Sequence, residues 1–535
     1  MAILAIAGKQ KSVADPNHAY ESVKKTWSKN RAICSGESAT KDYDGVLDTR
    51  TFSNLLIPFS PSMNPQQYAF YKAEAELPGI VSLYVKFLVG GLLRKQPQFG
   101  LPDNFPAELK ELATNWILQE FTQDSLQISS FIYESLMEEI QTARAWLYID
   151  YPSVTNTENL SREDFLKLKP YPVLWKAENV INWQTSKDPL TGQTVLSKVI
   201  LRGYEESFED NEFHPEYRDT VYVHEVIEGY YQIRKFQNRD TNKAPVMVQG
   251  VQQPQHSTGS ASFVEVEVNQ NILMNGERLT FIPAWPLNGS IDIQEPFITA
   301  LVDREIALYN KVSRRNHLLY GASTYTPVIS SDMGDAEFEE IVSGGLGTWL
   351  HLRQGDSASV LETPTHALAD MEVAIAKTVE EMAKMGVRML APESAESGIA
   401  LEIRNAAQTA TLGVLNTKVS GVMRDALAFM LNWRYDLELT GSDIDFTLSA
   451  DFNPSPLGAD WLRLVTEWYQ QGLLPRSVWL QILKQNDIVP SEYDDENAIQ
   501  EINGDEFIVP SSKEQEIFKE SKRVSQDLKS QIDED

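Results

Sequence analysis

The sequence predicts an α+β protein, in which helices and strands occupy separate stretches of a 535-residue chain. Apolar residues recur at helical spacing between about residues 66 and 141, and again beyond residue 296, as in amphipathic helices. Between about residues 171 and 286, short apolar runs alternate with turn residues instead, which is typical of β-strands. With 42% hydrophobic and 23% charged residues, the composition is that of a folded chain long enough for several domains.

Acidic residues outnumber basic residues in this chain. Asp and Glu total 76 against 47 Lys and Arg, which gives a formal net charge of -29. Such a chain repels nucleic acid on average, so a tight DNA contact would need a local basic patch. The acidity would suit a protein along which DNA slides. The alternative is that it only aids solubility.

The sequence lacks the signals of several other classes of protein. A single cysteine, Cys34, permits no intrachain disulfide. The first residues have no signal-peptide pattern, and the longest apolar stretch, 79–93, contains Lys86 and falls short of the ~20 residues of a membrane span. The seven histidines are scattered, and no P-loop motif occurs. We therefore expect no membrane span, no metal and no cofactor.

The first part of the chain is expected to be a polar, turn-rich arm over residues 1–65, followed by helices. The helices are predicted over 66–77, over 80–92, after Pro106 and over 125–141. The apolar stripes that we expect to be buried include Leu83 and Phe87 in the second of these helices and Leu112 in the third.

The β zone is predicted between Tyr171 and about Pro286. Its strands are expected at 195–202, 220–226, 230–236 and 263–268, after an earlier buried strand at 145–150. Asn275–Gly276 has the composition of a two-residue hairpin turn, because both residues tolerate positive φ. The stretch 238–262, rich in Gln, Pro, Gly and Ser, is predicted to be a loop.

Three long helices dominate the second half of the chain. They are predicted over 296–320, 366–386 and 399–437. The first opens on Pro296, a favourable first-turn residue. The third carries small residues that would let helices approach closely, namely Ala406, Ala407, Ala410, Gly413 and Gly421.

A compact insert of about 40 residues, 321–364, separates the first two long helices and is unusually long for a plain connection. Its strands are expected at 326–330 and 348–352. The stretch 391–398 (APESAESG) breaks the chain between the second and third helices. Beyond them we expect a strand at 444–452 and helices at 461–471, 477–485 and 512–532.

Basic residues along the first two long helices are the candidate functional residues. They are Arg304, Lys311, Arg314, Arg315, Lys377, Lys384 and Arg388. If helices of many copies lined a channel, these side chains would form rings that face a phosphate backbone. The alternative is that they are ordinary surface charges, paired at helical spacing with Asp303, Glu305, Glu380 and Glu381.

No catalytic signature stands out, and we expect a protein that is not an enzyme. Adjacent carboxylates occur at Glu138–Glu139, Glu339–Glu340 and Glu380–Glu381. We interpret these pairs as solvated helix faces rather than as general acid/base pairs. Ser394 and Ser397 lack the glycines of a nucleophile elbow. Trp461 and Trp468 share one helix face and are expected in a core rather than under stacked bases.

Five segments of the sequence form a recognisable series. They are AWLYIDYPS (145–153), KPYPVLWKAENVINWQ (169–184), FIPAWPLNG (281–289) and the longer segments 295–330 and 393–427. Taken in order, they resemble the portal proteins (head-to-tail connectors) of tailed bacteriophages, and more narrowly the portal branch with an uncharacterised domain. The resemblance spans about residues 20 to 450. Its motifs are packing and turn patterns, so their order and spacing carry it.

The resemblance implies a portal fold, with a wing, a two-helix stem, a small α/β clip, a long wing helix and a helical C-terminal crown. The implied parts are an N-terminal arm (1–65), the wing with helices and then strands (66–293), the first stem helix (294–320), the clip (321–365), the second stem helix (366–387), the tunnel loop (388–398), the long wing helix and a strand (399–453) and the crown (454–535). The tunnel-loop candidates are Ala391, Pro392, Glu393, Ser394, Ala395, Glu396, Ser397 and Gly398.

A portal of this family forms a ring, usually a homododecamer, at one capsid vertex. The resemblance implies a channel that passes double-stranded DNA without sequence specificity during packaging and ejection. The implied partners are the terminase large subunit, the head–tail adaptor and the major capsid and scaffolding proteins. The implied location is the virion, after assembly in the host cytoplasm. The alternatives are another structural virion protein, such as an adaptor or internal core protein, and a carboxylate-based enzyme.

Overall fold

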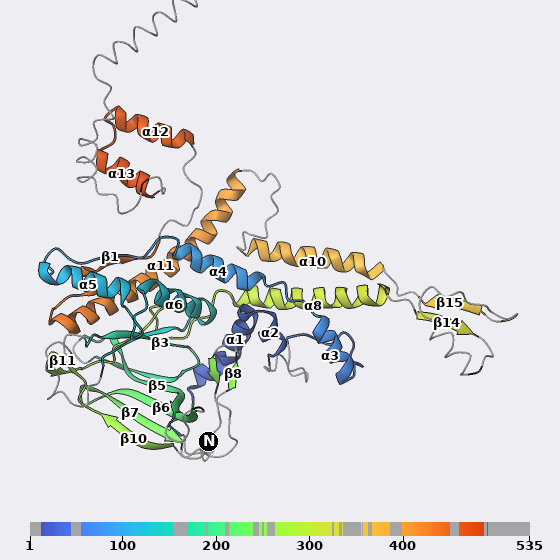
Figure 1. The fold of residues 1–535 in the computed structure, drawn as a ribbon, viewed down its shortest axis with the longest axis horizontal. Helices are drawn as coiled ribbons and strands as arrows, with labels where there is room; N and C mark the ends of the chain where they lie inside the picture. The colour runs from blue at the N-terminus through green and yellow to red at the C-terminus, as the bar shows by residue number, and fades with distance from the viewer. Residues whose placement is uncertain are drawn as a thin grey trace, which may run out of the picture. The chain divides into compact units, whose positions relative to one another are not determined.

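The computed structural model divides the chain into two compact units, residues 1–452 and 453–535. The residues that it describes are 12–43, 55–152, 168–188, 191–208, 213, 215–238, 246–248, 251–253, 263–323, 326–330, 334, 355, 357–361, 366–385, 398–449, 459–485 and 489. The first unit combines helices with two larger antiparallel sheets and, among the described residues, four two-stranded ones, which agrees with the predicted α+β class (Figure 1).

Helices α1 (His18–Ser35) and α2 (Glu37–Lys41) show that the prediction of a turn-rich N-terminal arm was wrong. The side chain of Asn17 caps the start of α1. Trp27 is fully buried against strands of the larger sheet. The apolar periodicity of α1 is weak because its buried face also carries polar residues such as Arg31.

Four helices follow, close to the predicted bounds. They are α3 (Pro65–Glu74), α4 (Ile80–Leu92), α5 (Ala107–Gln119) and α6 (Ile128–Thr142). Leu83, Phe87 and Leu112 are nevertheless 55%, 45% and 64% exposed, so their predicted burial was wrong. In α4 the neighbouring row through Val81, Val85 and Val89 faces the core instead.

The strands form a five-stranded and a three-stranded antiparallel sheet. The larger has the order β10–β7–β6–β5–β4 and the smaller the order β13–β2–β3. Their bounds are β2 (Trp146–Asp150), β3 (Tyr171–Trp175), β4 (Val180–Lys187), β5 (Thr194–Ser207), β6 (Glu216–Ile227), β7 (Tyr230–Asn238), β10 (Phe263–Asn269) and β13 (Ala284–Pro286). The strands predicted at 145–150, 195–202, 220–226, 230–236 and 263–268 are confirmed.

Smaller strands complete the first unit. They are β1 (Gln98–Gly100) paired with β16 (Asp445–Thr447), β8 (Val246–Val248) paired with β9 (Val251–Gln253), and β11 (Leu273–Met274) paired with β12 (Glu277–Arg278). The pair β8–β9 lies within the predicted loop 238–262, and β16 is shorter than the predicted strand 444–452. The turn at Asn275–Gly276 is confirmed, with φ of 53° and 87°.

The three long helices are confirmed as α8 (Thr299–Ser323), α10 (His366–Lys384) and α11 (Gly398–Tyr435). Helix α8 begins after Pro296, because residues 296–299 form a turn in which Thr299 N donates to Pro296 O at 3.0 Å. In the insert, β14 (Thr326–Ser330) pairs with β15 (Ser357–Leu361), a strand that the sequence did not predict. The predicted strand 348–352 lies outside the described residues.

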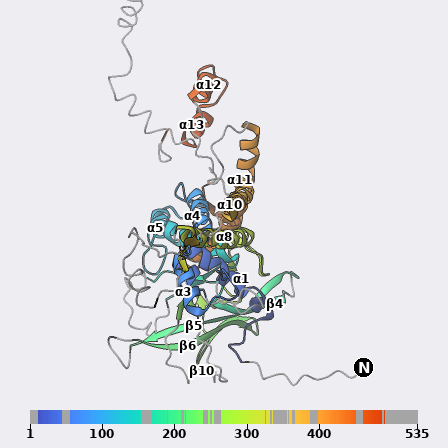
Figure 2. The same cartoon turned by 90° about the vertical axis from the view of Figure 1, so that its right-hand side faces the viewer.

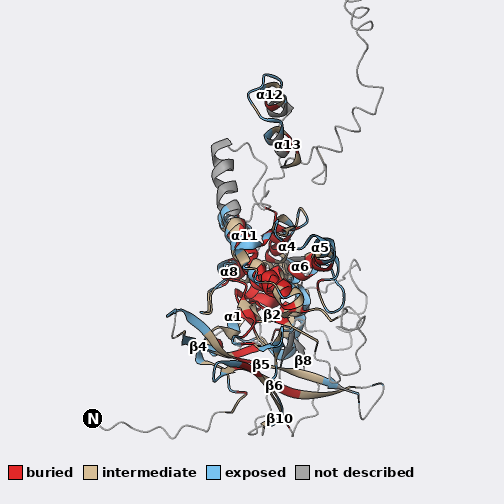
Figure 3. Cartoon of the chain, turned by 90° about the vertical axis from the view of Figure 1, so that its left-hand side faces the viewer, coloured by how far each residue is buried: buried red, intermediate tan, exposed pale blue. Residues whose placement is uncertain are grey.

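One large hydrophobic core joins the helices of the first unit to its sheets. It includes residues of α1, α4, α5, α6, α8 and α11 and of the three-stranded sheet. Figure 3 shows these buried residues (red) gathered around α4, α6 and β2. The body that holds α8 in place is therefore a single packed core.

The second unit contains helices α12 (Ala459–Gln470) and α13 (Arg476–Gln485), as predicted. The rings of Tyr469 and Trp479 stack between them at 4.6 Å. Trp468 is 36% exposed, so its predicted burial in a core was wrong. The side chain of Trp461 and the predicted helix 512–532 lie outside the described residues.

Candidate functional site

The candidate basic residues lie on α8 and α10, two antiparallel helices that run side by side (Figures 1 and 2). Arg304 Nη1 lies 3.2 Å from Glu381 Oε2, and Arg315 Nη1 lies 3.2 Å from Glu372 Oε1. The two ion pairs lie at separate points along the contact between α8 and α10, as the antiparallel register of the helices allows.

Lys311 lies between these ion pairs and also reaches across to α10. Its Nζ donates to Thr378 Oγ1 at 2.5 Å and to the carbonyl oxygen of Ala374 at 3.4 Å. Thr378 is buried and Lys311 is half-buried, so this contact is partly shielded from water. On α10 itself, Lys384 pairs with Glu380 one turn away, with Nζ and Oε1 separated by 2.6 Å.

The structure therefore brings most of the candidate residues into contacts within one chain. Glu380 and Glu381 are ion-pair partners, as the alternative interpretation predicted, although Glu381 pairs across the helices rather than along one. Lys377 is exposed on α10. Arg388 and residues 391–397 of the tunnel loop lie outside the described residues, and Gly398 is the first residue of α11.

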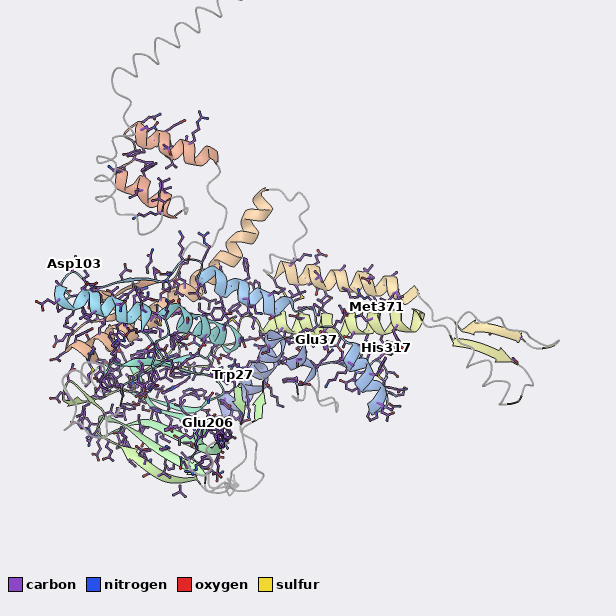
Figure 4. The ribbon with its side chains drawn as sticks, viewed as in Figure 1. Trp27, Glu37, Asp103, Glu206, His317 and Met371 are labelled. Carbon is purple, nitrogen blue, oxygen red and sulfur yellow. The ribbon has the colours of Figure 1, made fainter. Side chains whose placement is uncertain are left out.

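Arg314 differs from its neighbours because it faces α3 rather than α10. Burial raises the pKa of Tyr71 of α3 to about 12, and the positive charge of Arg314 opposes that rise. His317 also lies on this side of α8 (Figure 4), with its Nδ1 3.5 Å from Glu74 Oε2. The ring of His317 packs 4.8 Å from that of Phe59. This side of α8 is thus used for packing within the chain.

Helix α8 is anchored in the body by Glu305, which the sequence placed among surface carboxylates. Its two carboxylate oxygens accept hydrogen bonds from Ile80 N at 2.8 Å and Val81 N at 2.6 Å. Helix α4 starts after Gly79, which offers no side-chain cap, so Glu305 satisfies its first N–H groups. Burial raises the pKa of Glu305, and these hydrogen bonds oppose the rise.

Further contacts hold the same part of α8. Asn310 Nδ2 donates to the carbonyl oxygen of Leu55 at 2.9 Å, and Ile57 N donates to Asn310 Oδ1 at 2.8 Å. Asp303, another predicted surface carboxylate, pairs with Lys29 of α1. These contacts hold α8 in place against α1, α4 and the segment around Leu55.

Glu138 and Glu139 of α6 are buried, so the prediction of a solvated face was wrong for this pair. Arg31 of α1 donates to Glu138, and its Nη2 also lies 2.7 Å from Glu178 Oε2. Glu139 accepts from Ala145 N at 3.1 Å, and burial raises its pKa to about 8. These carboxylates tie α1, α6 and the start of β4 together.

Three of the small residues that the sequence singled out, Ala410, Gly413 and Gly421, belong to the part of α11 whose side chains the structure describes. A Cβ atom added to Gly413 or Gly421 would meet nothing within 4 Å. Ala410 and Val414 on the same face are exposed. The side chains of Ala406 and Ala407 lie outside the described residues. The described part of this face is therefore not used for packing within one chain.

The described residues contain no group of three or more His, Cys, Asp or Glu side chains placed to hold a metal ion. They also contain no helix with the length and apolar character that crossing a bilayer requires.

Residues 297–434 match the model of a family described as a domain of unknown function (DUF4055). The match starts just before α8 and ends at the last turn of α11, so it covers the paired helices, the insert and the long helix. No curated protein matches the chain.

Proposed function

We propose that this chain is the subunit of a phage portal, a ring at one capsid vertex through which DNA is packaged and ejected. The observation that supports it is the order of elements over residues 299–435. Two antiparallel helices flank an insert with a two-stranded ribbon, and a 38-residue helix follows. In this proposal α8 and α10 are the stem, residues 321–365 are the clip and α11 is the long wing helix.

The surfaces that one copy leaves uncovered favour assembly into a ring. Among the described strands, β14 and β15 pair only with each other. An isolated two-stranded ribbon is marginally stable, and its open edges can pair with strands of a neighbouring copy. Val373 on the outer face of α10 is 69% exposed, and the face of α11 with Gly413 is open. Neighbouring copies in a ring would cover both helices.

The charges of the stem helices suit DNA that slides rather than binds. Helices α8 and α10 carry six basic and six acidic residues in a chain of net charge -29. The carboxylates of Glu381 and Glu372 compensate the charges of Arg304 and Arg315, and Lys311 is held by neutral groups of α10, so these three cations are engaged within the chain. Lys377 and Lys384 on the exposed side of α10 are the channel-lining candidates within this proposal.

The proposal also covers the activity, location and partners of the ring. It acts without enzymatic activity or a cofactor, and it is part of the virion. Its partners are the terminase large subunit, the head–tail adaptor and the capsid and scaffolding proteins. The alternative of an adaptor or internal core protein predicts no need for the insert in DNA packaging.

Replacing residues 324–365 with a short Gly/Ser linker tests this function. We expect sedimentation to show that the full chain and the variant both form rings, at about 725 kDa for twelve copies of the 60.4 kDa full chain. The variant should fail to package DNA with terminase, because the docking surface is missing. A linker variant that still packages DNA, or a full chain that stays at 60.4 kDa at high concentration, would contradict the proposal.

A further inference from the structure

A chain of hydrogen bonds connects the two sheets of the first unit. It starts at His224 of β6, whose Nδ1 lies 2.6 Å from Tyr231 Oη of β7. Tyr231 Oη lies 3.1 Å from Tyr148 Oη of β2 in the smaller sheet. Tyr148 Oη in turn lies 3.5 Å from Asp150 Oδ1 at the end of β2.

Three members of this chain are sealed inside the protein. His224, Tyr231 and Tyr148 are buried, and the ring of Trp175 stacks on that of Tyr148 at 4.5 Å. Asp150 is only partly buried. The series of hydrogen bonds therefore runs from the interface between the sheets to a carboxylate near the surface.

Asp150 accepts two further hydrogen bonds, so both of its carboxylate oxygens act as acceptors. Tyr171 Oη of β3 donates to Oδ2 at 3.2 Å, and Tyr151 N donates to Oδ1 at 2.9 Å. Among the described residues, the titratable groups that face Asp150 are Tyr148 and Tyr171, and those that face His224 are Tyr148 and Tyr231.

The direction of the chain follows from the number of protons that each group can donate. An ionised carboxylate only accepts, and a tyrosine has one O–H to give. If the Tyr148 O–H donates its hydrogen bond to Asp150, the Tyr148 oxygen must accept a hydrogen bond from the Tyr231 O–H. Tyr231 then has no proton left for the imidazole, so it must accept from His224 Nδ1–H.

We propose that Tyr148 and Tyr231 form a directed proton relay through which ionised Asp150 holds neutral His224 in its Nδ1–H tautomer. The imidazole is neutral because burial lowers the pKa of His224 to about 3. Burial also raises the pKa of Asp150. This inference does not depend on the proposed function.

The direction of these hydrogen bonds reverses when the four side chains together take up one proton. Because His224 is buried, the proton reaches its Nε2 during a local opening of the interface between the sheets, and the Nδ1–H proton passes to Tyr231. Tyr231 then passes its own proton to Tyr148, and Tyr148 passes its own to Asp150. The result is neutral Asp150 and His224 in the Nε2–H form, with both tyrosines neutral as before. The tautomer in the buried interface thus reports the protonation state of a carboxylate near the surface.

Solid-state NMR of the sedimented full chain, labelled with 15N-histidine, distinguishes the two directions. His224→Gln assigns the His224 resonances by their loss. Near neutral pH we expect the Nδ1–H tautomer in the wild type. Tyr148→Phe cuts the relay and leaves Tyr231 free to donate to Nδ1, so we expect the Nε2–H tautomer in that variant.

Tyr171→Phe is the matched control, because it removes a different hydroxyl from Asp150 and should keep the Nδ1–H tautomer. Asp150→Asn is a second variant should Tyr148→Phe fail to fold, and it should lose the preference for Nδ1–H. A wild type in the Nε2–H form, or a folded Tyr148→Phe protein that keeps Nδ1–H, would overturn the proposal.

Discussion

The carboxylate of Glu305 in α8 accepts a hydrogen bond from the backbone N–H of Ile80 at the start of α4, with a separation of 2.8 Å. The two residues lie 225 positions apart in the sequence. One end of the first long helix is therefore fixed by a helix cap that another helix requires. A buried carboxylate in this position stabilises the junction between the paired helices and the body.

Removing the carboxylate should weaken this junction. We expect Glu305→Ala to lower the free energy of unfolding by about 2 kcal/mol, because two buried N–H groups lose their acceptor. Glu305→Gln should cost less, because its amide oxygen can still accept one of the bonds. Asp303→Ala, in the exposed pair with Lys29, should cost under about 1 kcal/mol. Urea unfolding at fixed protein concentration measures all three, and equal losses would refute the capping role.

The buried ion network at Arg31 should be far more sensitive than the ion pairs of α8 and α10. We expect Arg31→Met to lower the free energy of unfolding by about 3–5 kcal/mol, because Glu138 and Glu178 would be left buried without a cation. Arg315→Met is the control, since its pair with Glu372 is largely exposed, and it should cost under about 1 kcal/mol. Thermal unfolding of both variants tests the difference, and a mild Arg31→Met phenotype would count against the network.

Acid should destabilise the protein partly through His224. Burial lowers the pKa of His224 from 6.5 to about 3, so the unfolded chain binds a proton more readily. Stability present above pH 6.5 is therefore lost as the pH falls from 6.5 towards 3, by about 2–4 kcal/mol. Unfolding measured across this range should show a shallower acid dependence in His224→Gln. Identical slopes in both proteins would contradict the assignment.

The ion pair between Arg315 and Glu372 should be detectable by a double-mutant cycle. We expect Arg315→Glu to destabilise the protein by about 1 kcal/mol, because it faces Glu372 across the helices. Adding Glu372→Arg should restore most of the loss, which gives a coupling free energy of about 0.5–1 kcal/mol. Urea unfolding of the single and double variants provides the values. Zero coupling would mean that Arg315 is available to a ligand or to another copy.

The paired helices were predictable, because each contains a sustained apolar period and a strand-forming stretch lies between them. The partners of their cations were harder to predict. Glu381 lies 77 positions from Arg304 in the sequence, and only the register between two helices decides whether a cation pairs along its own helix or across. The small-residue strand β15 also gave no clear apolar signal.

Buried polar residues caused the larger errors. Helix α1 was predicted as turns because its buried face includes Arg31, whose carboxylate partners lie 107 and 147 positions away. The same contacts bury Glu138, which the sequence alone placed in solvent. Periodicity assumes that buried faces are apolar, so it fails where distant charges satisfy one another.

Single-particle electron microscopy of the purified full-length chain tests the central claim most directly. The proposal predicts end-on views of closed rings with rotational symmetry and a central channel wide enough for a DNA duplex, lined by α10 or α8. Only monomers at high concentration, or assemblies without any central opening, would contradict it.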